Sequence, residues 1–249
     1  MRSGSKPFLL IAILLAGVSQ PPSAYADGWT DTKNIADDII YEGRSHTFYC
    51  GCAYTSDGDR DGSGRIDPEL ACGYEGPSTH SHRAGRVEWE HIVPASLMPA
   101  RQRECWAGPG GSRSRCEDSD PVAQAMIFDL HNLAPSIGQV NALRDNDRYG
   151  ELPDWTSDFG ACPIEDTNGT FSPPPCLRGD VARVWFYMRE AHGVEIMPEE
   201  EVLFARWAEA DPVSPWESER ERRIARYSRV NNPFVDGVEP DETGACAWE

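Results

Sequence analysis

The cysteines constrain this chain more than any other feature, because eight of them follow what reads as an export signal. Arg2 and Lys6 precede an apolar run over residues 8–18, and Ala24 and Ala26 suit a cleavage site. We therefore expect residues 1–26 to be a signal peptide. The alternative, a membrane anchor, is disfavoured because the run is about eleven residues and a spanning helix needs roughly 20.

An even number of cysteines in an exported protein predicts disulfide bonds rather than zinc ligands. The only close pair is Cys50-Gly51-Cys52, and no second close pair completes a zinc-binding spacing. Four bridges would use every cysteine, namely Cys50, Cys52, Cys72, Cys105, Cys116, Cys162, Cys176 and Cys246.

Length and periodicity indicate a single domain over residues 27–249, because about 220 residues can bury one core and no repeat divides them. Glycine-rich and polar loops are expected over residues 56–67, 76–85 and 107–119, and irregular structure over 150–175. The pattern predicts a strand over 86–93 and helices over 31–41, 121–133, 136–148, 180–192, 198–210 and 215–229. Asp120 followed by Pro121 and Ser214 followed by Pro215 are expected to cap the starts of two of these helices, and Gly193 is expected to cap the end of a third.

The charge distribution divides the chain into two parts. A formal net charge of −18 argues against a polyanionic partner, because nucleic-acid affinity depends on cations that displace counterions. Residues 83–148, however, hold eight arginines against nine acids, net −1, whereas the remainder holds fifteen cations against thirty-two acids, net −17. Arginine's planar fork matches phosphate oxygens, so this segment could bind phosphate. A solvated acidic surface suited to salty surroundings accounts for the rest.

The run from Glu88 to His91 places two carboxylates and an imidazole at the end of the predicted strand. Strand alternation sends Glu90 and His91 to opposite sides unless the backbone turns before Pro94. Carboxylates suit Mg²⁺, and a neutral imidazole can take a proton from water near neutral pH. Most isolated histidines are structural, so this run alone does not assign a role.

A second polar cluster strengthens the functional interpretation. It begins at His131 and Asn132, and Asn141 and Arg144 follow three residues apart on one face of the next predicted helix.

Ten segments in order resemble the bacterial endonuclease I family of periplasmic and secreted nucleases, and together they cover nearly all of the mature chain. Six lie in the first part: TFYCGC at 47–52, CGY at 72–74, RVEWEHIVPA at 86–95, QRECW at 102–106, DLHNLAPS at 129–136 and VN at 140–141. Four lie in the C-terminal part: WFYMR at 185–189, LFARW at 203–207, WESER at 216–220 and NPF at 232–234.

The resemblance implies a mixed, helix-rich α+β domain, stabilised by disulfides, that carries a ββα-metal (His-Me finger) active site. It also implies endonucleolytic cleavage of DNA, and usually RNA, without sequence preference, to 5′-phosphate ends. The implied cofactor is one Mg²⁺, for which Mn²⁺ or Ca²⁺ can substitute. We expect a monomer in the periplasm or the medium, without membrane contact after signal cleavage.

Site roles carry over residue by residue. By resemblance, His91 is the general base, Glu90 and Asn141 are the Mg²⁺ ligands, and Arg113 stabilises the phosphate. The loop over residues 107–115 is one residue longer than the family pattern, so Arg115 could replace Arg113. Three further residues either orient the site or serve the fold alone: His131, Asn132 and Arg144. Glu88 could ligate the metal, although an ion pair with Arg83 or Arg86 is the simpler interpretation.

The first departure from the family is an acidic loop. Acids at alternate positions with glycine at the sixth follow the pattern of calcium loops, although the twelfth position is Pro68 rather than glutamate. The loop either binds structural Ca²⁺ or is a solvated acidic loop. Its candidate ligands are Asp57, Asp59, Asp61, Ser63 and Asp67.

The second departure concerns the disulfides. Ser218 stands where the family has cysteine, and Cys176 is new. The resemblance implies Cys50–Cys246, Cys52–Cys72 and Cys105–Cys116, and the new cysteine then implies Cys162–Cys176.

Phosphodiester hydrolysis requires a proton acceptor for water and a neutraliser for the charge that builds on phosphate. With an ordinary histidine pKa, His91 predicts activity that rises through about pH 6 to 7.5. Two alternatives are a secreted calcium-binding or adhesion module, and a relative that acts on another phosphodiester or as a toxin. The module explains the charge but not the ordered nuclease segments.

Overall fold

The computed structural model describes residues 28–56, 62–67, 72–152, 158–167 and 169–249. The expected signal peptide lies outside these residues, as do Asp57, Asp59 and Asp61 of the candidate calcium loop. Within the described ranges, none of the helices has both the length and the apolar character that crossing a membrane requires.

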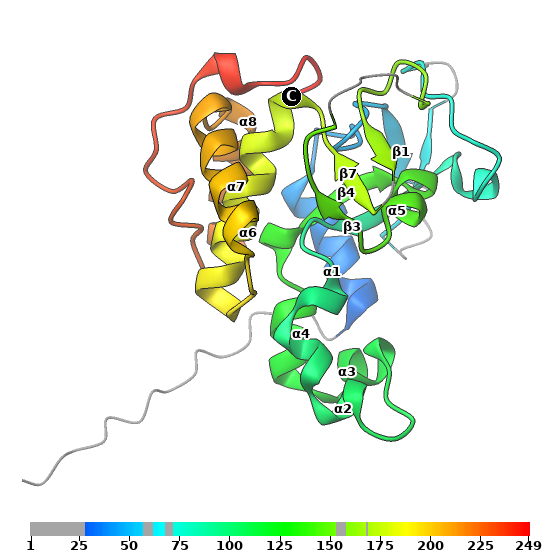
Figure 1. The fold of residues 1–249 in the computed structure, drawn as a ribbon, viewed down its shortest axis with the longest axis vertical. Coiled ribbons are helices and arrows are strands. Elements are labelled where there is room, and N and C mark those ends of the chain that lie inside the picture. Colours follow the sequence, from blue (N-terminus) through cyan, green and yellow to red (C-terminus); the bar gives the residue numbers. More distant parts are fainter. Residues whose placement is uncertain (1–27, 57–61, 68–71, 153–157, 168) are drawn as a thin grey trace, which may run out of the picture.

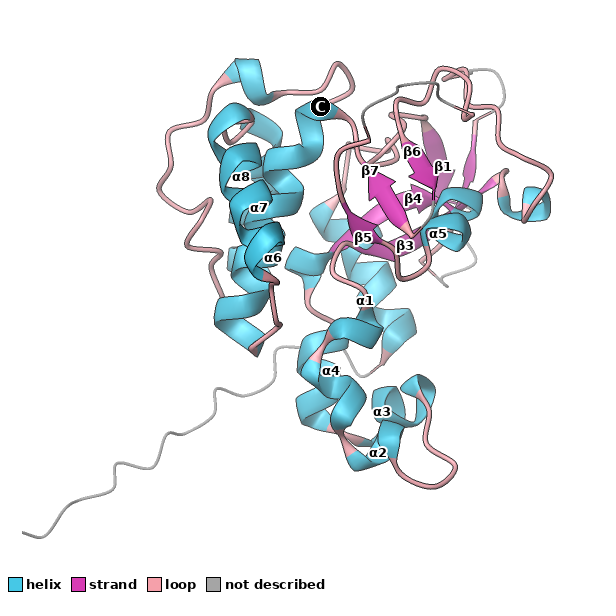
Figure 2. Ribbon diagram, viewed as in Figure 1, coloured by secondary structure: helices cyan, strands magenta, loops and turns pink. Residues whose placement is uncertain are grey.

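A four-stranded antiparallel sheet with a helix against it lies beside the three long helices of the C-terminal part (Figure 2). Its strands run in the order β1 (Tyr54–Ser56), β2 (Gly64–Ile66), β3 (Arg86–His91) and β4 (Leu133–Ile137). In the β3–β4 pair, Glu90 lies opposite Ala134 and His91 opposite Leu133. Helix α5 (Gly138–Arg144) follows β4 directly and packs against β3. The unit β3, β4, α5 is thus an antiparallel strand pair followed by a helix.

A helical excursion separates β3 from β4 and projects from the sheet (Figure 1). It contains α2 (Glu104–Ala107), α3 (Arg113–Ser119), α4 (Pro121–Ile127) and the 3-10 turns Ala95–Leu97, Pro99–Gln102 and Leu130–Asn132. Asp120 caps α4 by accepting from the amides of Val122 and Ala123, with Pro121 as the first helical residue, as predicted. The excursion brings Arg113 and the carbonyl of Ile127 back toward the end of β3.

Two predicted helices are shorter than expected. The helix predicted over residues 121–133 ends at Ile127, and Asp129 caps the next turn by accepting from the amide of His131. The helix predicted over 136–148 begins only at Gly138, because Leu133–Ile137 form β4, whose five residues are all buried.

A second, three-stranded sheet runs in the order β5 (Arg148–Tyr149), β7 (Thr170–Ser172), β6 (Glu165–Thr167). Its buried Phe171 ring packs on Tyr49, with 4.8 Å between ring centroids. The hydroxyl of Tyr49 in turn hydrogen-bonds that of Tyr149, which anchors this sheet beneath the site.

Three helices, α6 (Arg178–His192), α7 (Pro198–Ala210) and α8 (Pro215–Ser228), lie side by side on the side away from the sheets (Figure 1). The predicted caps are confirmed: Gly193 ends α6 with φ 71°, and Ser214 begins α8 by accepting from the amide of Glu217. Helix α1 (Trp29–Ile35) continues as a π-helical turn over Ala36–Ile40, and this turn packs against α8. Residues 242–244 form a last 3-10 turn.

Four disulfides hold the domain, and two of the four predicted pairings were wrong. Cys52–Cys72 and Cys105–Cys116 are confirmed. The predicted Cys50–Cys246 and Cys162–Cys176 are replaced by Cys50–Cys162 and Cys176–Cys246, with Cα–Cα distances of 4.7 and 5.3 Å. The path of the chain explains the exchange: Cys162 lies against the backbone of Tyr49, next to Cys50. Cys176, just before α6, meets the C-terminal tail instead.

Candidate active site

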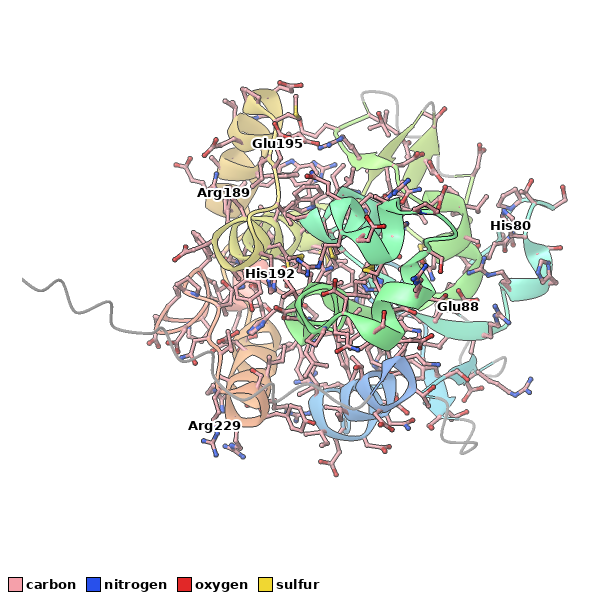
Figure 3. The ribbon with its side chains drawn as sticks, turned by 90° about the horizontal axis from the view of Figure 1, so that it is seen from below. His80, Glu88, Arg189, His192, Glu195 and Arg229 are labelled. Atoms are coloured by element: carbon pink, nitrogen blue, oxygen red, sulfur yellow. A yellow bond between two sulfur atoms is a disulfide. The ribbon has the colours of Figure 1, made fainter. Side chains whose placement is uncertain are left out.

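The end of β3 places Glu90 and His91 on opposite faces of the strand, as alternation predicted. Glu90 contacts Tyr49 and Arg144 on one face, whereas His91 stacks on Trp29 on the other. Both nevertheless line the same cavity of about 640 Å³, because it lies at the strand's end. Figure 3 shows Glu88 of the same strand on the side of the sheets, far from His192 and Arg229 of the helical side.

The hydrogen bond of His91 fixes which of its nitrogens carries the proton. Nε2 lies 2.8 Å from the carbonyl oxygen of Ile127. A carbonyl can only accept, so Nε2 donates and Nδ1 is the unprotonated nitrogen. The side chain is therefore held as a neutral imidazole with one nitrogen able to accept a proton.

Burial keeps His91 neutral over a wide pH range. The ring is only 8% exposed, and this burial, with the nearby positive charge of Arg113, lowers its pKa to about 3. The expected rise of activity through about pH 6 to 7.5 assumed an ordinary histidine pKa, and the lowered pKa of His91 argues against that assumption.

Glu90 is buried and held by two donors. Tyr49 Oη lies 3.1 Å and Arg144 Nη1 2.8 Å from its Oε1. Burial raises the pKa of this carboxyl, and the charge of Arg144 only partly offsets that effect. Both of these bonds end on Oε1, so Oε2 is the oxygen left for another positive partner.

Arg144, in the last turn of α5, fixes the end of β3. Besides Glu90, its guanidinium donates to the carbonyl oxygens of His91 and Ile92, each at 2.8 Å, and stacks over Tyr149. The side chain of Asn132 holds Val93, the residue after Ile92. It accepts a hydrogen bond from the amide of Val93 and donates one to the carbonyl of Val93. Both residues thus hold the backbone over residues 91–93, at and just after the end of β3.

Asn141 and Glu88 meet at the cavity wall. The Asn141 amide donates to Glu88 Oε2 at 3.0 Å, and Glu88 also accepts from Arg83 and Arg86, confirming the predicted ion pair. Although partial burial raises the pKa of Glu88, the hydrogen bonds and charges of the two arginines lower it overall. Because the Nδ2 of Asn141 already donates to Glu88, its Oδ1 is the atom left to accept a hydrogen bond from a ligand or to coordinate a cation.

The donors at this cavity suit a hard cation. Glu90 Oε2 and Asn141 Oδ1 are oxygen ligands of the kind that Mg²⁺ takes, and both residues line the cavity. In the part of the chain that the structure describes, no group of three or more His, Cys, Asp and Glu residues could hold a metal ion. Glu90 and Asn141 are the two candidate donors, and a pair of donors would leave positions for water and substrate.

Arg113, not Arg115, lines the cavity. Arg113 is the first residue of α3, and its Nε lies 2.8 Å from Glu117 Oε1. Arg115 is exposed, and its guanidinium reaches the carbonyl of Pro109. The Cys105–Cys116 bridge closes the loop that carries Arg113.

His131 lies away from the cavity, in a buried polar network. Its Nδ1 is 3.1 Å from Asp129 and its Nε2 3.0 Å from Glu221. Tyr187 and His192 of α6 donate to the other oxygen of Asp129. These contacts join α6 and α8 to the start of β4, so the structure places His131 within the fold and not among the residues of the cavity.

Sequence reasoning missed Trp29, Tyr49 and Trp106, although Trp29 and Trp106 line the cavity and Tyr49 holds Glu90. The sequence held one signal for Trp29: it lies four residues before Lys33, so both side chains share one face of α1. Both residues line the cavity.

Of the candidate ligands in the acidic loop, the structure describes Ser63 and Asp67 but not the three aspartates, so calcium binding there stays a prediction.

The sequence of this chain is similar to those of known nucleases. A sequence model of the family Endonuclease I matches residues 30–239. An extracellular deoxyribonuclease of Aeromonas hydrophila is 36% identical over 201 residues, 79% of this chain and 84% of that protein. A periplasmic deoxyribonuclease of the same species is 34% identical over 210 residues, 82% and 84% of the two chains. An extracellular ribonuclease of Bacillus subtilis is more distant: it is 28% identical over 130 residues, which are 45% of this chain and 44% of that protein.

Proposed function

The chain belongs to the endonuclease I family, and from that premise we propose that it is an exported, metal-dependent endonuclease that cleaves DNA, and also RNA, to 5′-phosphate ends. The names of the similar deoxyribonucleases support the DNA substrate and a periplasmic or extracellular location, and that of the ribonuclease supports RNA. Cleavage by a monomer without sequence preference is part of the proposal.

The observation that carries the proposal is the bond from His91 Nε2 to the carbonyl of Ile127. It leaves Nδ1 as the proton acceptor in a cavity that also holds Glu90, Asn141 and Arg113. A neutral imidazole, two hard oxygen donors and a guanidinium are the groups that hydrolysis of a phosphodiester requires.

Each residue then has a defined role. His91 takes a proton from the water whose oxygen attacks phosphorus, and Arg113 donates to a phosphate oxygen as negative charge develops there. Glu90 and Asn141 would hold one Mg²⁺, for which Mn²⁺ or Ca²⁺ could substitute. This cation would neutralise the phosphate and stabilise the departing 3′-oxygen. The unit β3, β4, α5 would be the ββα-metal motif.

Plasmid cleavage by the oxidised mature protein tests this function. We expect nicking and linearisation with Mg²⁺, none with EDTA, and a loss of roughly 10²-fold or more in His91→Ala. Full activity in His91→Ala, or in EDTA, would refute the mechanism. A matched control is His80→Asn, because His80 lies outside the cavity and asparagine tolerates its φ of 56°.

A further inference from the structure

We propose that Trp29 is a positioning residue for His91, so that α1 belongs to the active site. The inference rests on the proposed function. It concerns a residue that lies just before the stretch matched by the family, which starts at residue 30.

The indole of Trp29 lies parallel to the imidazole of His91. Their ring centroids are 5.3 Å apart and their planes differ by 18°. Trp29 also stacks on the buried ring of Phe128, next to Ile127, at 6.0 Å and 24°. The indole therefore contacts His91 and also the segment whose carbonyl accepts the hydrogen bond from His91.

Stacking and hydrogen bonding constrain different motions of the imidazole. The bond to Ile127 holds one edge of the ring, whereas the indole fixes the plane of the ring. Rotation about the Cβ–Cγ bond would break the first contact and lose the second. Together they keep Nδ1 as the nitrogen available to the cavity, which is the condition for proton abstraction.

The position of Trp29 is imposed by packing, because a helix of seven residues is not stable by itself. The π-helical turn after α1 buries Ala36 and Ile40 in a cluster with Trp89 of β3 and Trp216 of α8. Arg223 of α8 also donates to the carbonyl of Ile40 at 2.9 Å. Trp89 and His91 share one face of β3, so α1 is aligned along the face that carries the base.

The test replaces the flat ring while keeping apolar contact. Trp29→Leu fills part of the volume without stacking, Trp29→Phe restores an aromatic face, and Trp248→Leu is the matched control. Trp248 is also partly buried, but it packs near Gly51 and does not line the cavity. The readouts are kcat and KM for DNA with Mg²⁺, and the imidazole ¹⁵N resonances of His91 in metal-free protein.

We expect Trp29→Leu to lower kcat on the order of 10- to 100-fold with KM little changed, as misplacement of a reacting group does. Trp29→Phe should recover most of the loss, and Trp248→Leu should match wild type. The His91 resonances should show a single Nε2–H tautomer in wild type and Trp29→Phe, and an average of both tautomers in Trp29→Leu.

An unchanged tautomer and unchanged kcat in Trp29→Leu would overturn the proposal, as would an equal loss in Trp248→Leu. If Trp29→Leu does not fold, a Trp29→Phe variant with averaged tautomers would overturn it as well. The resonances are measured without metal or substrate, so this inference can fail while the nuclease activity stands, or hold if the activity fails.

Discussion

Arg144 and Glu90 form a fully buried ion pair, with 2.8 Å between Nη1 and Oε1, and the same nitrogen donates to the carbonyl of His91. One guanidinium thus sets the position of both the candidate metal ligand and the candidate base. Removing one partner of a buried pair leaves an uncompensated charge, whereas an exposed pair contributes little. The pair is therefore expected to matter for stability as well as for geometry.

Arg144→Met should destabilise the protein by about 3–5 kcal/mol, because Glu90 is left buried and unpaired. Adding Glu90→Gln should recover much of that loss while activity stays low. Urea unfolding measures both effects. The control is Glu201→Gln, which removes the exposed partner of Arg189 (Figure 3) and should change stability by less than about 1 kcal/mol. Equal effects at the two sites would contradict the assignment.

Arg113→Gln should lower kcat on the order of 10²-fold, because a donor to the developing phosphate charge is lost. Arg115→Gln is the matched control, two residues along the same short helix and outside the cavity, and it should retain near-wild-type rates. Steady-state cleavage of a defined DNA duplex measures both variants. The reverse order of effects would mean that Arg115 is the phosphate ligand.

Local sequence signals predicted the helices whose ends are capped. They failed for elements whose conformation depends on contacts with residues far away in the sequence. Gly193 and Ser214 marked the ends of helices correctly because caps act within one turn. Strand β4 was missed because Pro135 argues against a strand. β4 nevertheless lies at the edge of its sheet, where proline is tolerated.

The residues of the candidate site were identified by motif, but their partners were not. Arg144 could be placed near the site by helical spacing, yet its bond to Glu90 spans 54 residues. The stacking of Trp29 on His91 likewise joins distant parts of the chain and leaves no periodic signal. Disulfide pairing depends on the same long-range path, so Cys176 could not be assigned a partner from spacing.

Peptide mapping without reduction should recover Cys50 joined to Cys162 and Cys176 joined to Cys246. Cys176→Ser/Cys246→Ser should cost about 2–4 kcal/mol of stability with activity kept, because this bridge ties the C-terminal tail to the start of α6. Cys105→Ser/Cys116→Ser should reduce activity as well, since that bridge closes the loop of Arg113. A Cys50–Cys246 peptide would contradict the structure.

The network around His131 should make stability depend on pH. Burial lowers the pKa of His131, but hydrogen bonds and charge from Asp129 and Glu221 outweigh it and raise the pKa overall. This contribution is fully present below the unfolded pKa of about 6.5 and is lost as pH rises through the higher folded value. The pKa of Asp129 is held below its usual range, although burial opposes this, so its contribution is lost in acid.

His131→Gln should therefore destabilise the protein more at pH 6 than at pH 9, as measured by urea unfolding at both values. His80→Asn, which changes an exposed histidine, should alter the free energy of unfolding relative to wild type by the same small amount at each pH. A destabilisation in His131→Gln that is equal at the two values would show that the imidazole is not charged in the folded protein.

The rate should not follow an ordinary histidine titration. Because burial lowers the pKa of His91 to about 3, the ring is already fully in its neutral form well below pH 6 in the folded enzyme, and the population of the neutral form no longer changes above that pH. With saturating Mg²⁺ and DNA, kcat should thus be nearly constant from about pH 6 to 8, where an unperturbed imidazole would change its charge. Single-turnover cleavage across this range measures the chemical step. A rise in kcat with a midpoint near pH 6.5 would mean that water reaches His91 and that Trp29 of α1 does not shield the ring. If wild type and Trp29→Leu then gave the same dependence of kcat on pH, Trp29 would have no effect on the pKa of His91.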